Sequence, residues 1–203
     1  MLRAASELFS TRGYAGTTMS LIAERAGVAV QTVYFTFHTK GAVIAEVLGA
    51  CILGFDRWDP RIEAVVAADA RKAFAELHPW FAEFERAKTQ AEALAVFIAA
   101  SVEILERVGP LALAMGAAAA SDEQVKKVVD IGEQRRVEGF AVVAEKLANR
   151  GKLRRGVTVR RATDILLAIL SSETHQQLTT LRGWSSSECR RWFQDVLEQQ
   201  LIG

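Results

Sequence analysis

The chain has 203 residues, of which 50% are hydrophobic and 24% are charged, and its formal net charge is +1. This composition is that of an ordinary soluble globular protein, with room for one large domain or for a small domain and a larger one. No apolar run reaches the ~18 residues that a membrane helix needs, and the N-terminus has no signal-peptide pattern. A net charge this close to zero neither supports nor excludes nucleic-acid binding. If the protein binds nucleic acid, the positive charge for it has to lie in a local patch.

The two cysteines, Cys51 and Cys189, are far apart and adjoin no other cluster of ligand-type residues. They predict neither a zinc site nor a disulfide framework, and a reducing cytoplasm suits them. A thiol sensor is an alternative, but nothing nearby marks either thiol as activated. We expect a cytoplasmic protein without metal or cofactor.

Short helices are expected in the first 46 residues. Apolar residues recur at helical spacing along nearly the whole chain, which predicts an all-α fold. In chain order we expect helices over 2–12, 19–26 and 30–37, and a longer one from Lys40. Gly13 is a natural end for the first helix, Thr17 and Thr18 offer N-caps for the second, and Gly27 ends it after about two turns.

Longer helices are expected beyond residue 46. Asp59-Pro60 predicts a helix start that runs toward Leu77, and His78-Pro79 predicts its end. Further helices are expected over 89–107, 111–119, 122–149, 158–178 and 186–201. The change in helix length predicts a domain of residues 1–46 and a second domain of residues 47–203.

Residues 19–38 fit a helix-turn-helix. The motif needs a small residue where its helices touch, a turn residue that tolerates positive φ, and apolar residues that lock the second helix. Ala23, Gly27, and Val28 with Val33 meet these needs. Ile22 and Phe37 would complete a small core with Leu8 and Phe9. The alternative is a pair of packed helices within an all-α core.

The outer face of the second helix is expected to carry groups that read DNA. It would present Val30, Gln31, Thr32, Tyr34 and Thr36 to the major groove. Hydroxyl groups donate to phosphate oxygens, Gln pairs with adenine, and Val or Thr methyls touch the thymine methyl. Thr18 at a helix N-terminus and Lys40 would add phosphate contacts.

The stretch "AASELFSTRGYAGTTMSLIAERAGVAVQTVYFTFHTKGAVIAEVL" resembles the DNA-binding domain of the tetracycline-repressor (TetR) family. The matching residues are Ala5, Leu8, Phe9, Gly13, Thr17, Thr18, Ile22, Ala23, Gly27, Val28, Thr32, Val33, Tyr34, Phe37 and Lys40. The resemblance covers residues 2–48 and implies a homodimer that binds a palindromic operator in double-stranded DNA. The implied DNA contacts are Thr17, Thr18, Met19, Val30, Gln31, Thr32, Tyr34, Thr36, His38 and Lys40. His38 is otherwise a plain surface residue.

The sequence departs from the family at three points. Ala29 stands where a capping residue is usual, which costs typically ~1 kcal/mol. Gly41 stands where an acidic residue usually follows the lysine, and the basic arm that often precedes the first helix is not seen. Residues 1–50 carry four cations and three acids, 4 − 3 = +1. Affinity is therefore expected to depend on dimerisation and hydrogen bonds more than on counterion release.

In the family, the C-terminal domain dimerises and encloses a pocket for a small molecule. The last helices carry an apolar stripe that fits either a protomer core or a four-helix bundle with a twin subunit. Because palindromic half-sites require a two-fold dimer, we assign the stripe to the dimer interface. The assigned residues are Ile165, Leu166, Ile169, Leu170, Trp192, Phe193 and Val196. His175 falls between the two stretches and is interpreted as a surface or interface residue.

The pocket is expected among aromatic residues with few polar anchors. Its candidates are Trp80, Phe81, Phe84, Phe97, Glu103, Met115 and Phe140. Core packing is the competing interpretation for the apolar members, and a solvated helix face is the competing one for Glu103. The basic run over 150–161 is interpreted as a solvated loop and not as a second nucleic-acid patch.

These patterns predict a ligand-responsive transcriptional regulator, in the first place a repressor that a small apolar effector releases from its operator. An α-helical enzyme is disfavoured, because the three histidines at 38, 78 and 175 are scattered and no paired carboxylates lie on an apolar face. The remaining alternative is a helical small-molecule binding protein without DNA binding.

Overall fold

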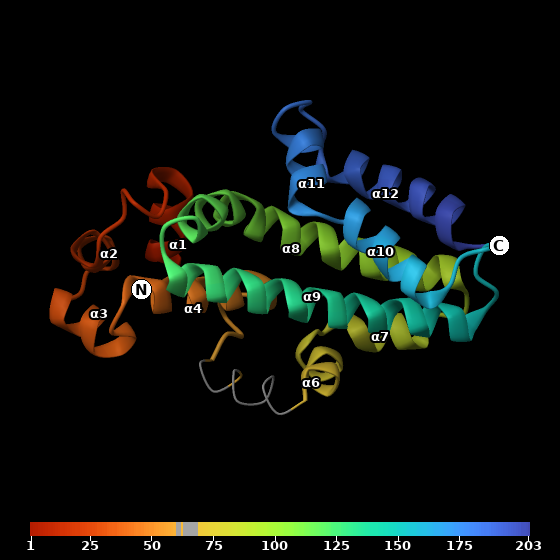
Figure 1. The fold of residues 1–203 in the computed structure, drawn as a ribbon, viewed down its shortest axis with the longest axis horizontal. Coiled ribbons are helices and arrows are strands. Elements are labelled where there is room, and N and C mark those ends of the chain that lie inside the picture. Colours follow the sequence, from red (N-terminus) through yellow and green to blue (C-terminus); the bar gives the residue numbers. More distant parts are fainter. Residues whose placement is uncertain (60–61, 63–68) are drawn as a thin grey trace. The chain divides into compact units, whose positions relative to one another are not determined.

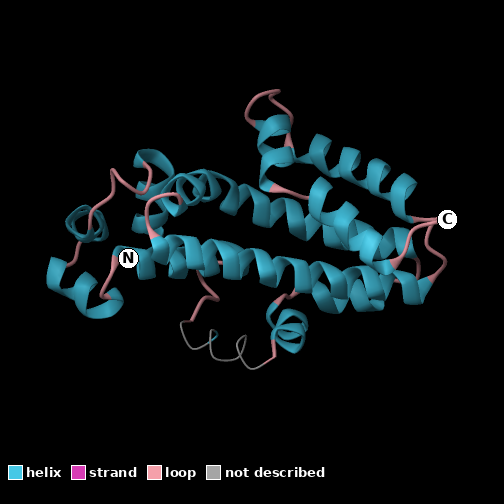
Figure 2. Ribbon diagram, viewed as in Figure 1, coloured by secondary structure: helices cyan, strands magenta, loops and turns pink. Residues whose placement is uncertain are grey.

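The computed structural model describes residues 1–59, 62 and 69–203, which form helices joined by loops (Figures 1 and 2). Their one β-type pairing is an isolated antiparallel bridge between Leu153 and Ile202. The all-α prediction is therefore confirmed. The helices are α1 (Leu2–Arg12), α2 (Met19–Ala26), α3 (Val30–Phe37), α4 (Lys40–Leu53), α6 (Ala70–Leu77), α7 (Trp80–Arg86), α8 (Gln90–Ala119), α9 (Glu123–Arg150), α10 (Val159–Ile169), α11 (Ser172–Thr179) and α12 (Ser186–Leu201).

The chain divides into two compact units. The first unit contains Met1–Pro60 and Arg107–Glu133, and the second contains Arg61–Glu106 and Gln134–Gly203. The long helices α8 and α9 therefore contribute one part to each unit. The predicted division at residue 46 falls inside α4, and a separately folding domain of residues 1–46 stays a prediction.

Helices α1 to α3 form a three-helix head, defined here as residues 2–37, and α1 and α3 pack on α4. Each helix turns one apolar stripe inward, as the 3.6-residue period requires. The predicted core of Leu8, Phe9, Ile22 and Phe37 is confirmed, since these side chains are buried together. Its other buried members are Ala5, Met19, Ala23, Val33, Val43, Ile44 and Val47.

Local caps set the length of α2. The hydroxyl of Thr18 accepts from the backbone N–H of Leu21 at 3.2 Å, as predicted for an N-cap. Gly27 ends the helix at φ 68° and ψ 33°, a left-handed conformation that glycine adopts without strain. Val28, predicted in the core, is 36% exposed. Its backbone N–H reaches back to the Ala23 carbonyl at 3.0 Å, so the residue continues the turn at the surface.

Helix α8 runs without a break through Pro110, although two helices, 89–107 and 111–119, were predicted. A proline inside a helix removes one backbone hydrogen bond and costs about 3 kcal/mol. Val102 and Leu105 before it and Leu111 and Met115 after it are all buried. Burying a side chain of this size contributes about 1.5–3 kcal/mol, so packing on both sides offsets the cost of the proline.

The predicted helix over 158–178 is instead two helices. α10 ends at Ile169, and Ser171 begins α11 by accepting from the backbone N–H of Thr174 at 3.1 Å. The apolar stripe runs on past this point, which hides the break from a periodicity argument. Thr179, one residue beyond the predicted end, closes α11.

Helices α6 and α7 lie on either side of Pro79 in the sequence. α6 ends at Leu77, as predicted, and Asp69 caps it by accepting from the backbone N–H of Lys72 at 3.0 Å. The single helix predicted from Asp59-Pro60 to Leu77 is wrong, because Asp69 is extended at φ −158° and ψ 94°, and its predicted first position, Pro60, lies outside the described residues. α7, from Trp80 to Arg86, was not predicted, because seven residues are too few to establish a helical period.

The core of the second unit joins parts of α7, α8 and α9 to α10 and α12. α10 and α12 lie side by side (Figure 1). α12 begins with a capping box, in which Ser185 and Glu188 exchange side-chain and backbone hydrogen bonds. No single helix in the described ranges is both long and apolar enough to cross a membrane, and only α3 with α4, bent by 76°, passes that test as a pair.

Candidate nucleic-acid interface and ligand region

One face of α3 points away from the head. Gln31 and Thr32 are exposed, Tyr34 is 50% exposed and Phe35 is 84% exposed. Val33 and Phe37 on the opposite face are buried in the head core, and α3 packs against α2 and α4. The helix therefore offers an amide, a hydroxyl, a phenol and a phenyl ring outward, a set that suits base edges and phosphates.

Two predicted contacts outside α3, Thr18 and His38, are also exposed. Thr18 lies at the N-terminus of α2, where unpaired backbone N–H groups favour an anion. His38 follows α3 with φ 61° and is exposed. Thr36 is exposed too, but its hydroxyl donates to the Thr32 carbonyl at 2.8 Å and so satisfies its own helix.

Four of the predicted DNA contacts are buried or half-buried, and three of them, Thr17, Met19 and Val30, lie in or against the head core. Thr17 is fully buried and its hydroxyl donates to the Gly13 carbonyl at 2.8 Å, while Met19 is 5% exposed. Val30 is half-buried against the head core. These three side chains support the head, so direct DNA contacts through Thr17 and Met19 are corrected to core roles.

Lys40, predicted to hold a phosphate, is engaged inside the first unit. Its ammonium group donates to the Tyr14 carbonyl at 2.8 Å and to the Thr17 carbonyl at 3.1 Å. The same group lies 4.0 Å from the centroid of the Tyr14 ring, within the range of a cation–π contact. Lys40 thus ties the loop before α2 to the first turn of α4.

Phe35 was missed by the sequence reasoning. Its exposure could have been predicted from helical spacing. Phe35 lies four positions after Gln31, on the same face, and two positions from the inward residues Val33 and Phe37. Aromatic side chains at helical spacing usually belong to a core, and in α3 the exposed ring of Phe35 lies among the hydroxyl residues Thr32, Tyr34 and Thr36.

The positive charges of the head are mostly paired. Arg25 forms a bidentate ion pair with Glu7, with its Nη2 atom 2.5 and 2.6 Å from the two carboxylate oxygens. Arg3 pairs with Asp56 at 2.7 Å. Both pairs are exposed and contribute little to stability, but they lower the charge that the first unit offers to DNA.

The second unit contains a cluster of rings, called here the aromatic cluster. Trp80 lies at its centre, with ring centroids 5.6 Å from Phe74, 5.5 Å from His78 and 5.4 Å from Phe97. Most contacts are tilted or edge-on, the geometry that ring quadrupoles favour. The members are Phe74, His78, Trp80, Phe81, Phe84, Phe97 and Phe140.

Two polar groups lie in this cluster. The indole Nε1–H of Trp80 is buried and has no hydrogen-bond partner among the described residues. An unpaired buried donor costs about 1–3 kcal/mol, so this group is suited to an acceptor from outside the chain. Burial of His78 lowers its pKa from 6.5 to about 4, so the ring is neutral at physiological pH.

The structure brings together five of the seven predicted pocket residues, namely Trp80, Phe81, Phe84, Phe97 and Phe140. Met115 lies in the core of the first unit instead. Glu103 is exposed and pairs with Arg190 at 3.4 Å, so it is on the wet face of α8. Met115 and Glu103 are therefore removed from the candidate ligand region.

The predicted dimer residues fall into two groups. Leu166, Leu170 and Phe193 are at most 1% exposed and pack in the core of their own protomer, which corrects their assignment to an interface. The remaining members are half-buried and still have surface to offer a second subunit. They are Ile165, Ile169, Trp192 and Val196. His175 is 5% exposed, so its interpretation as a surface residue is wrong.

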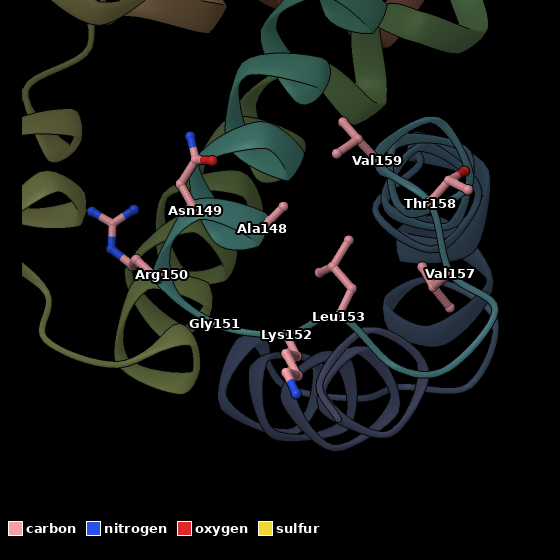
Figure 3. A pocket seen from close by; sticks show the side chains of 9 residues that line it. All are labelled: Ala148, Asn149, Arg150, Gly151, Lys152, Leu153, Val157, Thr158 and Val159. Carbon is pink, nitrogen blue, oxygen red and sulfur yellow. The ribbon is translucent and has the colours of Figure 1, made fainter.

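An open groove of about 650 Å³ is lined by Ala148–Leu153 and Val157–Val159 (Figure 3). Although Arg150 lines the groove, its guanidinium group is not available to a ligand there. It donates to the carbonyls of Phe84 at 2.7 Å and Glu85 at 3.1 Å, at the end of α7. Arg154 likewise donates to the Gln199 carbonyl at the end of α12. Both arginines satisfy helix C-termini, which supports a structural loop over a nucleic-acid patch.

Residues 1–47 match the family model of the bacterial regulatory proteins of the tetR family. None of the curated protein sequences matches the chain significantly. Similar solved structures include a putative TetR-family transcriptional regulator from Mesorhizobium loti, with 22% identity and a TM-score of 0.67 over 98% of this chain and 91% of that one. A putative transcriptional regulator from Saccharomonospora viridis in complex with choline has 19% identity and a TM-score of 0.68, over 100% and 95%.

A third similar structure is the transcriptional regulator FadR from Bacillus subtilis in complex with stearoyl-CoA. It has 16% identity and a TM-score of 0.68, and the match covers 97% of this chain and 95% of that one. At these identities the likenesses establish a shared fold along almost the whole chain.

Proposed function

We propose that the chain is a transcriptional regulator of the TetR family, which binds a palindromic DNA operator as a homodimer and leaves it when a small effector binds. Residues 1–46 would form the DNA-binding domain, and residues 47–203 would bind the effector and dimerise. The function is binding without catalysis, and it is exercised in the cytoplasm, where the operator lies.

The observation that carries this proposal is the outward face of α3. Gln31, Thr32, Tyr34 and Phe35 are exposed together on a helix whose other face is locked into the head by Val33 and Phe37. A rigid helix with exposed polar and aromatic side chains, preceded by a turn at Gly27, is what a major groove of about 12 Å width admits.

Two copies of this face are needed. A single eight-residue helix reaches only a few base pairs, and the head carries little unpaired positive charge. A two-fold dimer doubles the contacts and presents two heads to half-sites about 34 Å apart, one turn of DNA. Ile165, Ile169, Trp192 and Val196 are the candidate interface residues, because they keep exposed area on α10 and α12.

The aromatic cluster is the candidate effector region. A ligand that displaces or joins these rings gains apolar contact, and an acceptor atom on it satisfies the buried Nε1–H of Trp80. The complexes of fold neighbours with choline and with stearoyl-CoA support a small-molecule effector for this chain. We propose a largely apolar effector with one hydrogen-bond acceptor, and repression as the direction of control.

Selection from random duplex DNA tests the proposal. The wild-type protein should enrich a palindrome, and Tyr34→Ala should weaken binding to that duplex. Ile131→Ala is a matched control, because Ile131 is 48% exposed, close to the 50% of Tyr34, and lies on α9, outside the head. A folded dimer that enriches no sequence would refute DNA regulation.

The alternative, a helical binding protein without DNA binding, draws on the weak start of α3. Ala29 makes no side-chain cap hydrogen bond there. A flat titration with DNA, together with saturable binding of a small molecule, would favour that alternative.

A further inference from the structure

The corner between α8 and α9 reaches back to the head region. The Tyr14 hydroxyl donates to Oδ2 of Asp122 at 2.8 Å, and the Thr39 hydroxyl donates to Oε1 of Gln124 at 3.0 Å. Tyr14 lies in the loop before α2, and Thr39 caps α4 directly after α3. The two contacts therefore hold both ends of the helix-turn-helix. We call these residues, together with Gly41, the corner latch.

Gly41 allows the second contact. A Cβ atom at this position would lie 2.4 Å from Oε1 and 2.6 Å from Cδ of Gln124. The Gln124 side chain thus lies directly on the first turn of α4, in space that any other residue would fill. Glycine within a helix costs about 1 kcal/mol relative to alanine, and its backbone here is ordinary helix, so close approach is what the glycine provides.

The contact between Tyr14 and Asp122 is one of several interactions that the Tyr14 side chain makes. Lys40 lies over the Tyr14 ring, whose hydroxyl bonds Asp122, and the Tyr14 ring stacks on Phe9 at 5.8 Å. The hydrogen bond from Tyr14 lowers the pKa of Asp122, so its carboxylate is charged at neutral pH. The other carboxylate oxygen of Asp122 accepts from the backbone N–H groups of Gln124 at 2.9 Å and Val125 at 3.2 Å. Asp122 is therefore fixed by α9 and holds the head in turn.

We propose that Asp122 and Gln124 are positioning residues for DNA binding, although they lie more than 80 residues from the head in sequence. They fix the loop before α2 and the start of α4, and so fix the direction in which α3 presents its exposed face. A head held in place before binding does not have to be ordered by the DNA, which saves entropy on association. The inference rests on the proposed DNA-binding function.

Gly41→Ala separates positioning from stability. The new methyl group displaces the end of the flexible Gln124 side chain, while alanine favours the helix. We expect unfolding temperature to stay equal or rise and operator affinity to fall. The loss of one hydrogen bond, about 1 kcal/mol, corresponds to roughly fivefold for each head and about 25-fold for two heads. A purely structural residue would move stability and affinity in the same direction.

Three further variants complete the test. Gln124→Ala should lower affinity as Gly41→Ala does, and the double variant should be no weaker than either one, because both remove the same contact. Tyr14→Phe keeps the ring and removes only the donor to Asp122, so it should weaken binding by a similar factor. Gln134→Ala, an exposed glutamine further along α9, is the matched control and should bind as the wild type does.

The outcomes are separable when all variants are titrated with the duplex that the wild type selects. A wild type that binds while the latch variants bind within twofold of it overturns the positioning role alone. A wild type that selects no duplex overturns the proposed function and this role with it. Hydrogen exchange at residues 38–42 should accelerate in Gly41→Ala, and unchanged exchange there would show that the Gln124 contact does not hold the start of α4.

Discussion

Phe35 gives the sharpest test of the proposed DNA-binding face of α3, because its side chain makes few contacts in the folded protein. It is 84% exposed, so Phe35→Ala removes few internal contacts. A phenylalanine buries about 200 Å² when fully covered, which leaves about 170 Å² of Phe35 for a partner. If the groove covers half of this area, the gain is about 2 kcal/mol for each head at about 25 cal/mol per Å².

The expected result is a loss of operator affinity of about thirtyfold per head, or about 4 kcal/mol for a dimer with two heads. The free energy of unfolding should change by less than about 0.5 kcal/mol, as is usual at exposed positions. Fluorescence anisotropy with the selected duplex measures affinity, and thermal unfolding by circular dichroism measures stability.

Leu181→Ala is the matched control, since Leu181 is 73% exposed in the loop between α11 and α12. Phe35→Tyr should retain most of the affinity, because the ring remains. Equal affinity of Phe35→Ala and wild type would show that α3 does not enter the groove by this face. A marked loss of stability would show instead that Phe35 is part of the core.

Three other substitutions have defined outcomes. The pKa of His78 is lowered to about 4 by burial, so the unfolded chain takes up a proton first and stability is lost as pH falls from about 6.5 toward 4. Urea unfolding at about pH 7.5 and pH 5 should show about 1–2 kcal/mol less loss in His78→Phe than in wild type, a range discounted because the ring is only partly buried. Phe193→Ala should cost about 3–5 kcal/mol of unfolding free energy, because the ring is fully buried in the core. Ala29→Ser should add a side-chain cap to α3 and raise the unfolding temperature by about 2–4 °C, and an unchanged temperature would mean that the cap is not formed.

The head was predictable because its structure is set by local rules. Thr18, Gly27 and the apolar spacing of α1 to α3 each specify a cap, a turn or an inward face from within a few residues, and the three helices were predicted with their observed bounds. The same rules hold for the start of α12 at Ser185. Sequence reasoning succeeds where neighbours along the chain decide the outcome.

It fails where distant packing decides. Pro110 breaks a helix by local preference, but buried residues on both sides keep α8 continuous. The apolar stripe on α10 and α12 predicts a buried face, but it does not determine whether the same protomer or a second subunit covers that face. Leu166 and Phe193 are buried in the core of their own protomer. Thr17 carries a hydroxyl and was placed on the DNA, yet the loop folds its side chain under the head.

The low free charge of residues 1–50 and the glycine at position 41 can be explained together. Arg25, Arg3 and Lys40, three of the four cations among residues 1–50, are engaged with Glu7, Asp56 and the Tyr14 and Thr17 carbonyls. Long-range attraction to phosphates is therefore weak, and a steep salt dependence is not expected. Binding energy has to come from short-range contacts of α3, which are lost by a small misdirection of the helix. A head that reads DNA with hydroxyl and aromatic groups needs a fixed orientation more than a strongly charged head does, and Gly41 with Gln124 supplies such a support.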